Sequence, residues 1–194
     1  MHILKNLFIV VFLSFLFSIK GEAQTTEQSD FSGLKKCTVF SAGDDNVNSY
    51  RIPSLLTTKD GTLLVFCEAR RDSWRDKSRT DIVVKRSEDT GKTWSVMQDL
   101  TQGITGAYMD PTPILDSITG RIFLFTTFWP SEDHSGTKNR AILITSDDNG
   151  KTWSSPVDVT STIIPAGYHI VGFGPGAGLQ MSGKQFKERL VLPT

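Results

Sequence analysis

Short runs of β-branched and aromatic residues, separated by turns that contain glycine, alternate along the chain from about residue 50 onward. This pattern is typical of strands joined into hairpins. No amphipathic helical stretch of useful length interrupts it, so the sequence predicts an all-β protein. The strands expected in the first group cover residues 52–58, 62–67, 82–86 and 93–96, with turns at 59–61 and 89–91.

The whole pattern recurs 59 residues later. The segment Ser87–Ser95 reads SEDTGKTWS, and Ser146–Ser154 reads SDDNGKTWS. The turn glycines Gly61 and Gly120 and the third strand keep the same offset, which indicates a duplicated unit. A four-stranded antiparallel unit at this period is typical of a β-propeller blade. The second unit's strands are expected at 112–115, 121–128, 141–145 and from 152 onward.

Residues 178–181 and 189–193 predict the first hairpin of a third unit. Propellers close into rings of about four to eight blades. About two and a half blades would leave apolar sheet faces uncovered. We therefore expect this sequence to be the front portion of a longer protein.

The first residues predict a targeting segment. Leu7–Ile19 is an uncharged run of 13 residues after Lys5, shorter than the roughly 20 apolar residues that span a bilayer. Small residues at Gly21 and Ala23 suit a signal peptidase. We expect a signal peptide over 1–23, a propeller part over 24–194 and export to the periplasm, cell surface or medium, with no stable membrane span after cleavage. An uncleaved membrane anchor is the alternative.

The charge balance and the small number of cysteines and histidines limit the classes of ligand that this chain is expected to bind. Lys plus Arg and Asp plus Glu are both 21, so no basic excess supports a nucleic-acid partner. Two cysteines and three scattered histidines give little material for a metal site, and we expect no metal and no cofactor. An oxidising compartment permits a bridge between Cys37 and Cys67, and two buried free thiols are the favoured alternative.

The repeated S-x-D-x-G-x-T-W box is interpreted as structural. Its aspartate can accept backbone N–H bonds inside a turn, its glycine tolerates positive φ, and its tryptophan can pack at the blade edge. The stretch around Asp148 lacks the spacing and closing glutamate of a calcium loop. The residues of the two boxes are Ser87, Asp89, Gly91, Thr93, Trp94, Ser146, Asp148, Gly150, Thr152 and Trp153.

Two segments carry candidate chemistry. Arg51, in Tyr-Arg-Ile-Pro, begins an innermost strand, where a guanidinium fork suits a carboxylate or phosphate; a surface salt bridge is the alternative. Residues 68–76 hold six charges in nine positions. A carboxyl beside arginines on such a loop can donate or accept a proton. A solvated charged loop is the alternative.

Together these segments resemble the sialidase (neuraminidase) superfamily, in its bacterial and cellular branch, over about residues 38–194. The Tyr-Arg-Ile-Pro segment resembles its Phe/Tyr-Arg-Ile-Pro motif, and the two boxes resemble its Asp boxes. Met109–Pro113 and Gly174–Gln180 also resemble family segments. The resemblance implies a six-bladed β-propeller and an exo-α-sialidase. Such a glycoside hydrolase removes terminal sialic acid from glycoproteins, glycolipids and oligosaccharides with retention of configuration.

The same resemblance implies roles for four residues. Arg51 would be the first of three arginines that bind the sugar carboxylate, and Arg70 would contact a ring hydroxyl. Asp76 would be the loop acid/base, with Asp72 a nearby competitor for the role, and Asp110 would contact the O4 and N-acetyl side.

The family's nucleophilic tyrosine, its partner glutamate and two further arginines belong to later blades, which this sequence does not contain. The 194-residue chain alone is therefore expected to be inactive. A non-catalytic Asp-box propeller, a sialic-acid-binding lectin and a trans-sialidase remain alternatives for the parent protein.

Overall fold

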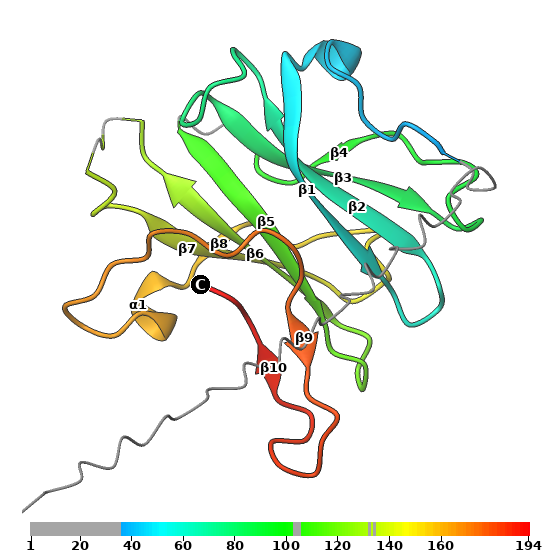
Figure 1. Cartoon of the computed structure of the whole chain (residues 1–194), viewed down its shortest axis with the longest axis vertical. Helices are drawn as coiled ribbons and strands as arrows, with labels where there is room; N and C mark the ends of the chain where they lie inside the picture. The colour runs from blue at the N-terminus through cyan, green and yellow to red at the C-terminus, as the bar shows by residue number, and fades with distance from the viewer. Residues whose placement is uncertain (1–35, 103–105, 132, 134) are drawn as a thin grey trace, which may run out of the picture. The chain divides into compact units, whose positions relative to one another are not determined.

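The computed structural model describes residues 36–102, 106–131, 133 and 135–194 (Figure 1). These residues belong to one compact unit, Lys36–Thr194. The expected signal peptide and its cleavage site lie outside the described residues. The elements are η1 (Asp44–Asn46), β1 (Ser49–Thr57), β2 (Leu63–Arg70), β3 (Thr80–Ser87), β4 (Gln98–Asp99), β5 (Ala107–Leu115), β6 (Ile122–Trp129), β7 (Arg140–Ser146), β8 (Val157–Asp158), α1 (Thr160–Ile163), β9 (Leu179–Gln180) and β10 (Leu190–Val191).

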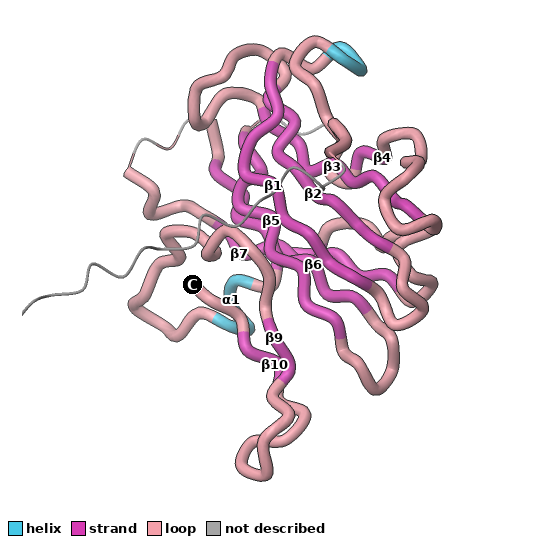
Figure 2. The backbone as a smooth tube through the Cα atoms, turned by 45° about the vertical axis from the view of Figure 1, so that its right-hand side comes forward, coloured by secondary structure: helices cyan, strands magenta, loops and turns pink. Residues whose placement is uncertain are grey.

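The predicted all-β class and the duplicated four-stranded unit are confirmed. Strands β1 to β4 form one antiparallel ladder and β5 to β8 form the second. A single parallel bridge, between Thr80 and Ala107, joins the two ladders. Figure 2 shows the strands of both units with long loops at their ends. A closed ring of blades is not seen among the described residues.

Both inner strands begin earlier than the sequence predicts, and each contains a bulge. The β1–β2 register shifts between Arg51 and Ser54, and the β5–β6 register shifts between Met109 and Thr112. An X-Pro pair lies inside each shift. The residue before each proline has positive φ, 52° at Ile52 and 58° at Asp110. Proline cannot donate to the ladder, so the strand tolerates it only at such an irregularity.

The two fourth strands each begin five residues later than predicted, at Gln98 and Val157. The box residues that were expected to pair instead form a turn. Next to the turn, the Ser95 hydroxyl accepts the N–H of Arg86 (3.0 Å), where a strand would supply a backbone carbonyl. The Ser154 hydroxyl does the same for Thr145 (3.0 Å). A regular ladder therefore resumes only after the turn.

In the first box, the Asp89 carboxylate accepts the backbone N–H groups of Lys92 and Thr93 and the Thr93 hydroxyl, at 2.7–3.0 Å. The Ser87 hydroxyl accepts the N–H of Gly91 (2.8 Å). Hydrogen bonds from Thr93 and Ser87 lower the pKa of Asp89 to about 2.

The second box repeats these bonds around Asp148. Burial acts to raise the pKa of Asp148. Hydrogen bonds from Thr152, Ser146 and Lys151 outweigh that effect and lower the pKa to about 2. Both boxes are therefore self-contained turns, as predicted.

The second box also docks on the first unit. Trp153 meets Phe66 edge-on, with ring centroids 5.6 Å apart. Gly150 has φ of +74°, and a Cβ there would lie 2.9 Å from both Leu64 methyl carbons. Gly91 in the first box has φ of +83° but looser surroundings, with the nearest atom 3.7 Å away. The box thus closes the apolar core between the units, whose buried members are Leu56, Leu64, Phe66, Ile82, Val84, Leu100, Tyr108, Ile122, Leu124, Ile142 and Ile144.

The predicted hairpin of a third unit is present as β9 and β10 (Figures 1 and 2). Its start is tied to the second unit, because the Gly178 N–H donates to the Pro113 carbonyl (2.9 Å). A cavity of about 630 Å³ with largely apolar walls lies between this hairpin, the segment around α1, and the second unit's sheet, with Phe123 and Phe125 on its wall.

The two cysteines are both free, which settles the choice left open by the sequence. Cys67 is buried and its thiol donates to the Arg51 carbonyl (3.0 Å). Burial raises the pKa of Cys67 to about 12, and the Glu68 charge adds to the increase. Cys37 is exposed, so the expectation that both thiols are buried is wrong for it. In the part of the chain that the structure describes, no helix is long and apolar enough to cross a bilayer.

Candidate functional site

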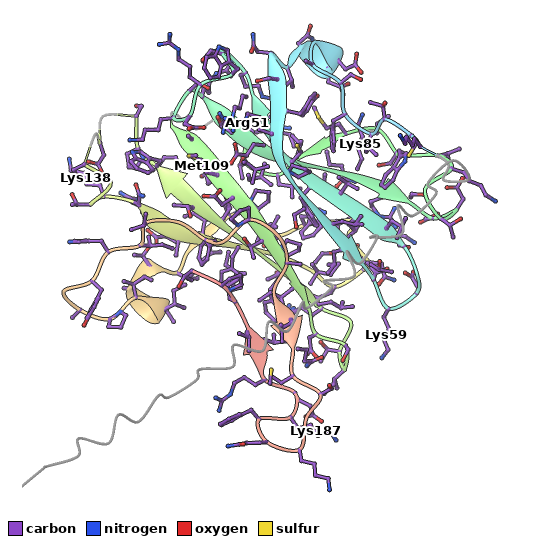
Figure 3. All side chains as sticks on the ribbon, viewed as in Figure 1. Arg51, Lys59, Lys85, Met109, Lys138 and Lys187 are labelled. Atoms are coloured by element: carbon purple, nitrogen blue, oxygen red, sulfur yellow. The ribbon has the colours of Figure 1, made fainter. Side chains whose placement is uncertain are left out.

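The candidate residues gather at one end of the first unit's sheet. Arg51 on β1 lies opposite Glu68 on β2. Arg70 follows Glu68 by two residues, and residues at this spacing on a strand share a face. The Asp boxes lie at the other end, because Thr80 pairs with Arg70 while Ser87 pairs with Leu63. Figure 3 shows Arg51 at the end of the sheet opposite Lys59, which lies in the β1–β2 turn.

A buried ion pair forms the base of the site. Arg70 donates from Nε (3.0 Å) and from Nη2 (2.7 Å) to Oε2 of Glu68. The two side chains are 1% and 0% exposed. Burial opposes the charged form of Arg70, but hydrogen bonds and charges from Glu68 and Asp76 outweigh it and raise the pKa of Arg70. The guanidinium is thereby held charged and in a fixed orientation.

Asp76 lies on the loop between β2 and β3 and contacts both arginines. Its Oδ1 accepts from Nη1 of Arg70 (2.7 Å) and from Nη1 of Arg51 (3.1 Å). The rival carboxylate Asp72 pairs instead with Arg79 (3.1 Å) at the surface. The loop geometry therefore assigns Asp76, not Asp72, to the arginine cluster.

Asp110 comes from the second unit and joins the cluster through its backbone. Its N–H donates to Oε1 of Glu68 (3.0 Å), so one buried carboxylate holds both Arg70 and the bulged segment of β5. Burial raises the pKa of the Asp110 carboxyl; the Arg70 charge lowers it, and the Asp76 charge raises it further. The side chains of Arg70, Asp76 and Asp110 thus share one electrostatic environment.

The outer part of this cluster is accessible to a ligand. Arg51 and Asp76 are 43% and 63% exposed, in contrast to the buried pair beneath them. A guanidinium has five N–H donors, and Asp76 is reached by one terminal nitrogen of Arg51. An anionic ligand can therefore approach the guanidinium of Arg51, with a carboxyl group beside it.

Sequence reasoning did not assign Glu68 to the site. Burial raises the pKa of the Glu68 carboxyl, while hydrogen bonds from the Asp110 N–H and Arg70 offset part of that increase. A signal was present, because a charged residue lies in an apolar strand two positions before an arginine. No cluster of His, Cys, Asp and Glu suited to a metal ion occurs among the residues that the structure describes.

Comparisons with known proteins agree with this architecture. Residues 52–194 match the BNR repeat-like domain family. A sialidase from Bacteroides fragilis is 33% identical over 175 residues, which cover 79% of this chain and 31% of that protein. Sialidase-2 of Cricetulus griseus is 35% identical over 165 residues, covering 76% of this chain and 42% of that protein. The chain thus spans less than half the length of these curated relatives.

Solved structures give the same result. The Hadza microbial sialidase Hz136 superposes with a TM-score of 0.66 at 31% identity, covering 72% of this chain and 32% of that one. With its BNR repeat-like domain and its sialidase relatives in sequence and in structure, the chain belongs to the sialidase superfamily.

Proposed function

We propose that this chain forms the front part of an exo-α-sialidase built on a six-bladed propeller, and that its arginine and aspartate cluster binds and helps to cleave terminal sialic acid. The observation that carries the proposal is the Asp76 carboxylate held against Arg51 and Arg70, at the exposed end of the inner strands. The sialidase relatives support the reaction class.

The chemistry suits these side chains. The exposed Arg51 guanidinium binds the sugar carboxylate, and such charge-assisted pairing orients the neighbouring anomeric carbon. Asp76 in its protonated form gives its proton to the glycosidic oxygen while the bond from that oxygen to the anomeric carbon breaks. The bonding electron pair stays on the oxygen, and the aglycone leaves as an alcohol. The anomeric carbon is taken by the nucleophilic tyrosine that the family resemblance implies for a later part of the complete protein; this tyrosine gives its proton to its partner glutamate and forms a covalent intermediate. Water then attacks the anomeric carbon and gives a proton to the Asp76 carboxylate, while the tyrosine leaves and takes its proton back from the glutamate, so the configuration is retained.

The test compares the complete protein with the 194-residue chain. Both receive 4-methylumbelliferyl sialoside and sialyllactose, and the products are separated. We expect the complete protein to release free sialic acid and the isolated chain to release none, since general acid catalysis alone supplies only about 10²–10⁴-fold. Sialoside binding without cleavage by the complete protein would overturn the proposal in favour of a lectin, and transfer of sialic acid to lactose would identify a trans-sialidase.

Two substitutions connect the activity to the site. Asp76→Asn removes the proton donor, and Arg51→Lys keeps the charge but loses the fork geometry. Each is expected to reduce turnover of sialyllactose by about 10²-fold or more. Arg79→Lys is a matched control, since Arg79 pairs with Asp72 on the same loop at the surface. The leader proposal is checked separately by N-terminal sequencing of the exported protein, which should begin at Gln24.

A further inference from the structure

The loop that carries Asp76 is also held from the second unit. The ammonium of Lys77, the next residue, lies 3.7 Å from the centre of the Trp129 ring. Trp129 is the last residue of β6. A cation at this distance over an indole face is attracted by the ring's electrons, and tryptophan is the strongest of the aromatic partners.

Trp129 is itself fixed on the second unit. Its indole N–H donates to the Asp133 carbonyl (2.6 Å). A Cβ at Gly136 would lie 3.2 and 3.4 Å from two atoms of the ring, so the backbone there lies close against the indole. The position of the ring is therefore set by its contacts with Asp133 and Gly136.

The backbone of Lys77 is a second, independent observation. Its φ is 63°, in the left-handed region that a residue with a Cβ seldom adopts. Such a conformation persists where the surroundings impose it, and it is frequent at functional sites. Here it occurs directly beside the carboxylate that bridges Arg51 and Arg70.

We propose that Lys77 and Trp129 are positioning residues for the Asp76 carboxyl, and that this contact between the two units keeps Asp76 aimed at the glycosidic oxygen. The inference rests on the proposed function. Neither residue touches the reacting atoms. The pair restrains the exposed side of the loop, while Arg70 holds the Trp74 carbonyl (2.7 Å) on its buried side.

The proposal makes a prediction that depends on the leaving group. A sugar alcohol needs a proton from Asp76 as it departs, whereas 4-nitrophenol is acidic enough to depart without one. If the Asp76 carboxyl is displaced from the glycosidic oxygen, cleavage of sialyllactose should therefore slow much more than cleavage of 4-nitrophenyl sialoside. Small displacements of a reacting group can cost up to about 10²-fold in rate. Because Asp76 also serves the later water step, which both substrates share, the measured quantity is kcat/KM, which reports cleavage of the glycosidic bond. We expect Lys77→Met in the complete protein to reduce kcat/KM on sialyllactose by about 10-fold, and kcat/KM on the nitrophenyl substrate by less than about 2-fold.

Three further variants complete the experiment. Lys77→Arg keeps the cation over the ring and should restore most of the activity on sialyllactose. Trp129→Leu removes the ring face and should reproduce the selective loss. Lys138→Met removes an exposed positive charge between β6 and β7, at the position labelled in Figure 3, and should leave both rates unchanged. Thermal unfolding of each variant shows whether it is folded, and the exposed Lys77 variants are informative even if Trp129→Leu does not fold.

The outcomes separate the two proposals. If the unaltered complete protein cleaves neither substrate, the proposed function fails. If it cleaves both, and Lys77→Met slows both equally or slows neither, the positioning role is refuted while the sialidase activity stands.

Discussion

Replacing Glu68 by glutamine tests whether the buried pair beneath the site holds it together. The carboxylate accepts three hydrogen bonds, two from Arg70 and one from the Asp110 N–H. An amide of the same shape has one acceptor oxygen, and its NH₂ would face donors. Removing one partner of a buried ion pair costs about 3–5 kcal/mol, because the other charge stays buried without compensation. Asp76 still contacts Arg70, but it is 63% exposed and an exposed pair offsets only about 0–1 kcal/mol.

The measurement is urea-induced unfolding at pH 7, followed by tryptophan fluorescence. Glu68→Gln should lower the free energy of unfolding by about 3–5 kcal/mol. Asp76→Asn, which removes the other anion on the same guanidinium, should lower it by about 0–1 kcal/mol. A double variant, Glu68→Leu with Arg70→Met, leaves no buried charge without a partner. It should lower the free energy of unfolding by only about 1–3 kcal/mol, the cost of leaving the Asp110 N–H without its acceptor. Equal losses for the two single variants would refute the reasoning.

Three more predictions concern the scaffold. Gly150→Ala should lower the free energy of unfolding by about 2–5 kcal/mol, because it adds overpacking to positive-φ strain. Gly91→Ala should lower it by about 1–2 kcal/mol, because only the strain applies there. Similar values for the two variants in urea unfolding would contradict the packing difference. The pKa of Asp148 is lowered, so its stabilisation is complete above about pH 4, the ordinary range for an aspartate, and is lost as the pH falls toward 2; acid unfolding should show a shallower loss in Asp148→Asn than in the unaltered protein. An Ellman titration should label Cys37 at once and Cys67 only after unfolding, and rapid reaction of two thiols in the folded protein would argue against the burial.

The sequence was sufficient for the elements whose signal is local. The hairpin turns and the two boxes were located because their glycines and aspartates act within a few residues. The fourth strands were placed too early, because a tryptophan and a threonine in the box look like strand residues. The backbone N–H groups of the threonines, Thr93 and Thr152, in fact donate to the carboxylates of Asp89 and Asp148. Local hydrogen bonds from side chains to the backbone therefore determine the structure of this segment, despite the strand propensity of its residues.

The site was predictable only in part, for a different reason. Arg51, Arg70 and Asp76 were identified through their likeness to a family. The choice of Asp76 over Asp72 required the closure of the loop, which pairs Asp72 with Arg79. Such contacts depend on the backbone path by which the loop returns to the sheet, and the order of residues in the loop does not reveal that path.

The pair of Lys77 with Trp129 was beyond the sequence altogether, and for Glu68 the sequence showed only a charged residue in an apolar strand. Glu68 acts through a backbone N–H that arrives from the second unit, 42 residues away. Trp129 meets Lys77 across the same boundary. Interactions between units are set by how the sheets pack, so a one-dimensional pattern that identifies each unit correctly still does not reveal them.

The two units have the same backbone bulge in their inner strands but place different side chains next to it. Arg51 and Met109 occupy the same place in their strands, just before the register shift (Figure 3). The residue directly after each bulge proline is also used alike: the Thr112 hydroxyl donates to the Gly174 carbonyl, and the Ser54 hydroxyl donates to the Gly176 carbonyl. Both units therefore share the bulge and the hydroxyl hydrogen bond that follows it, which we call the anchor. The side chain just before the bulge differs, since it is Arg51 in the first unit and Met109 in the second. A substitution at the residue before the shift can change charge without disturbing the anchor, because the anchoring hydroxyl lies beyond the bulge. The first unit thus presents a guanidinium from the residue before its bulge, whereas the second unit has Met109 there and presents Asp110 from inside its bulge, where the first unit has Ile52.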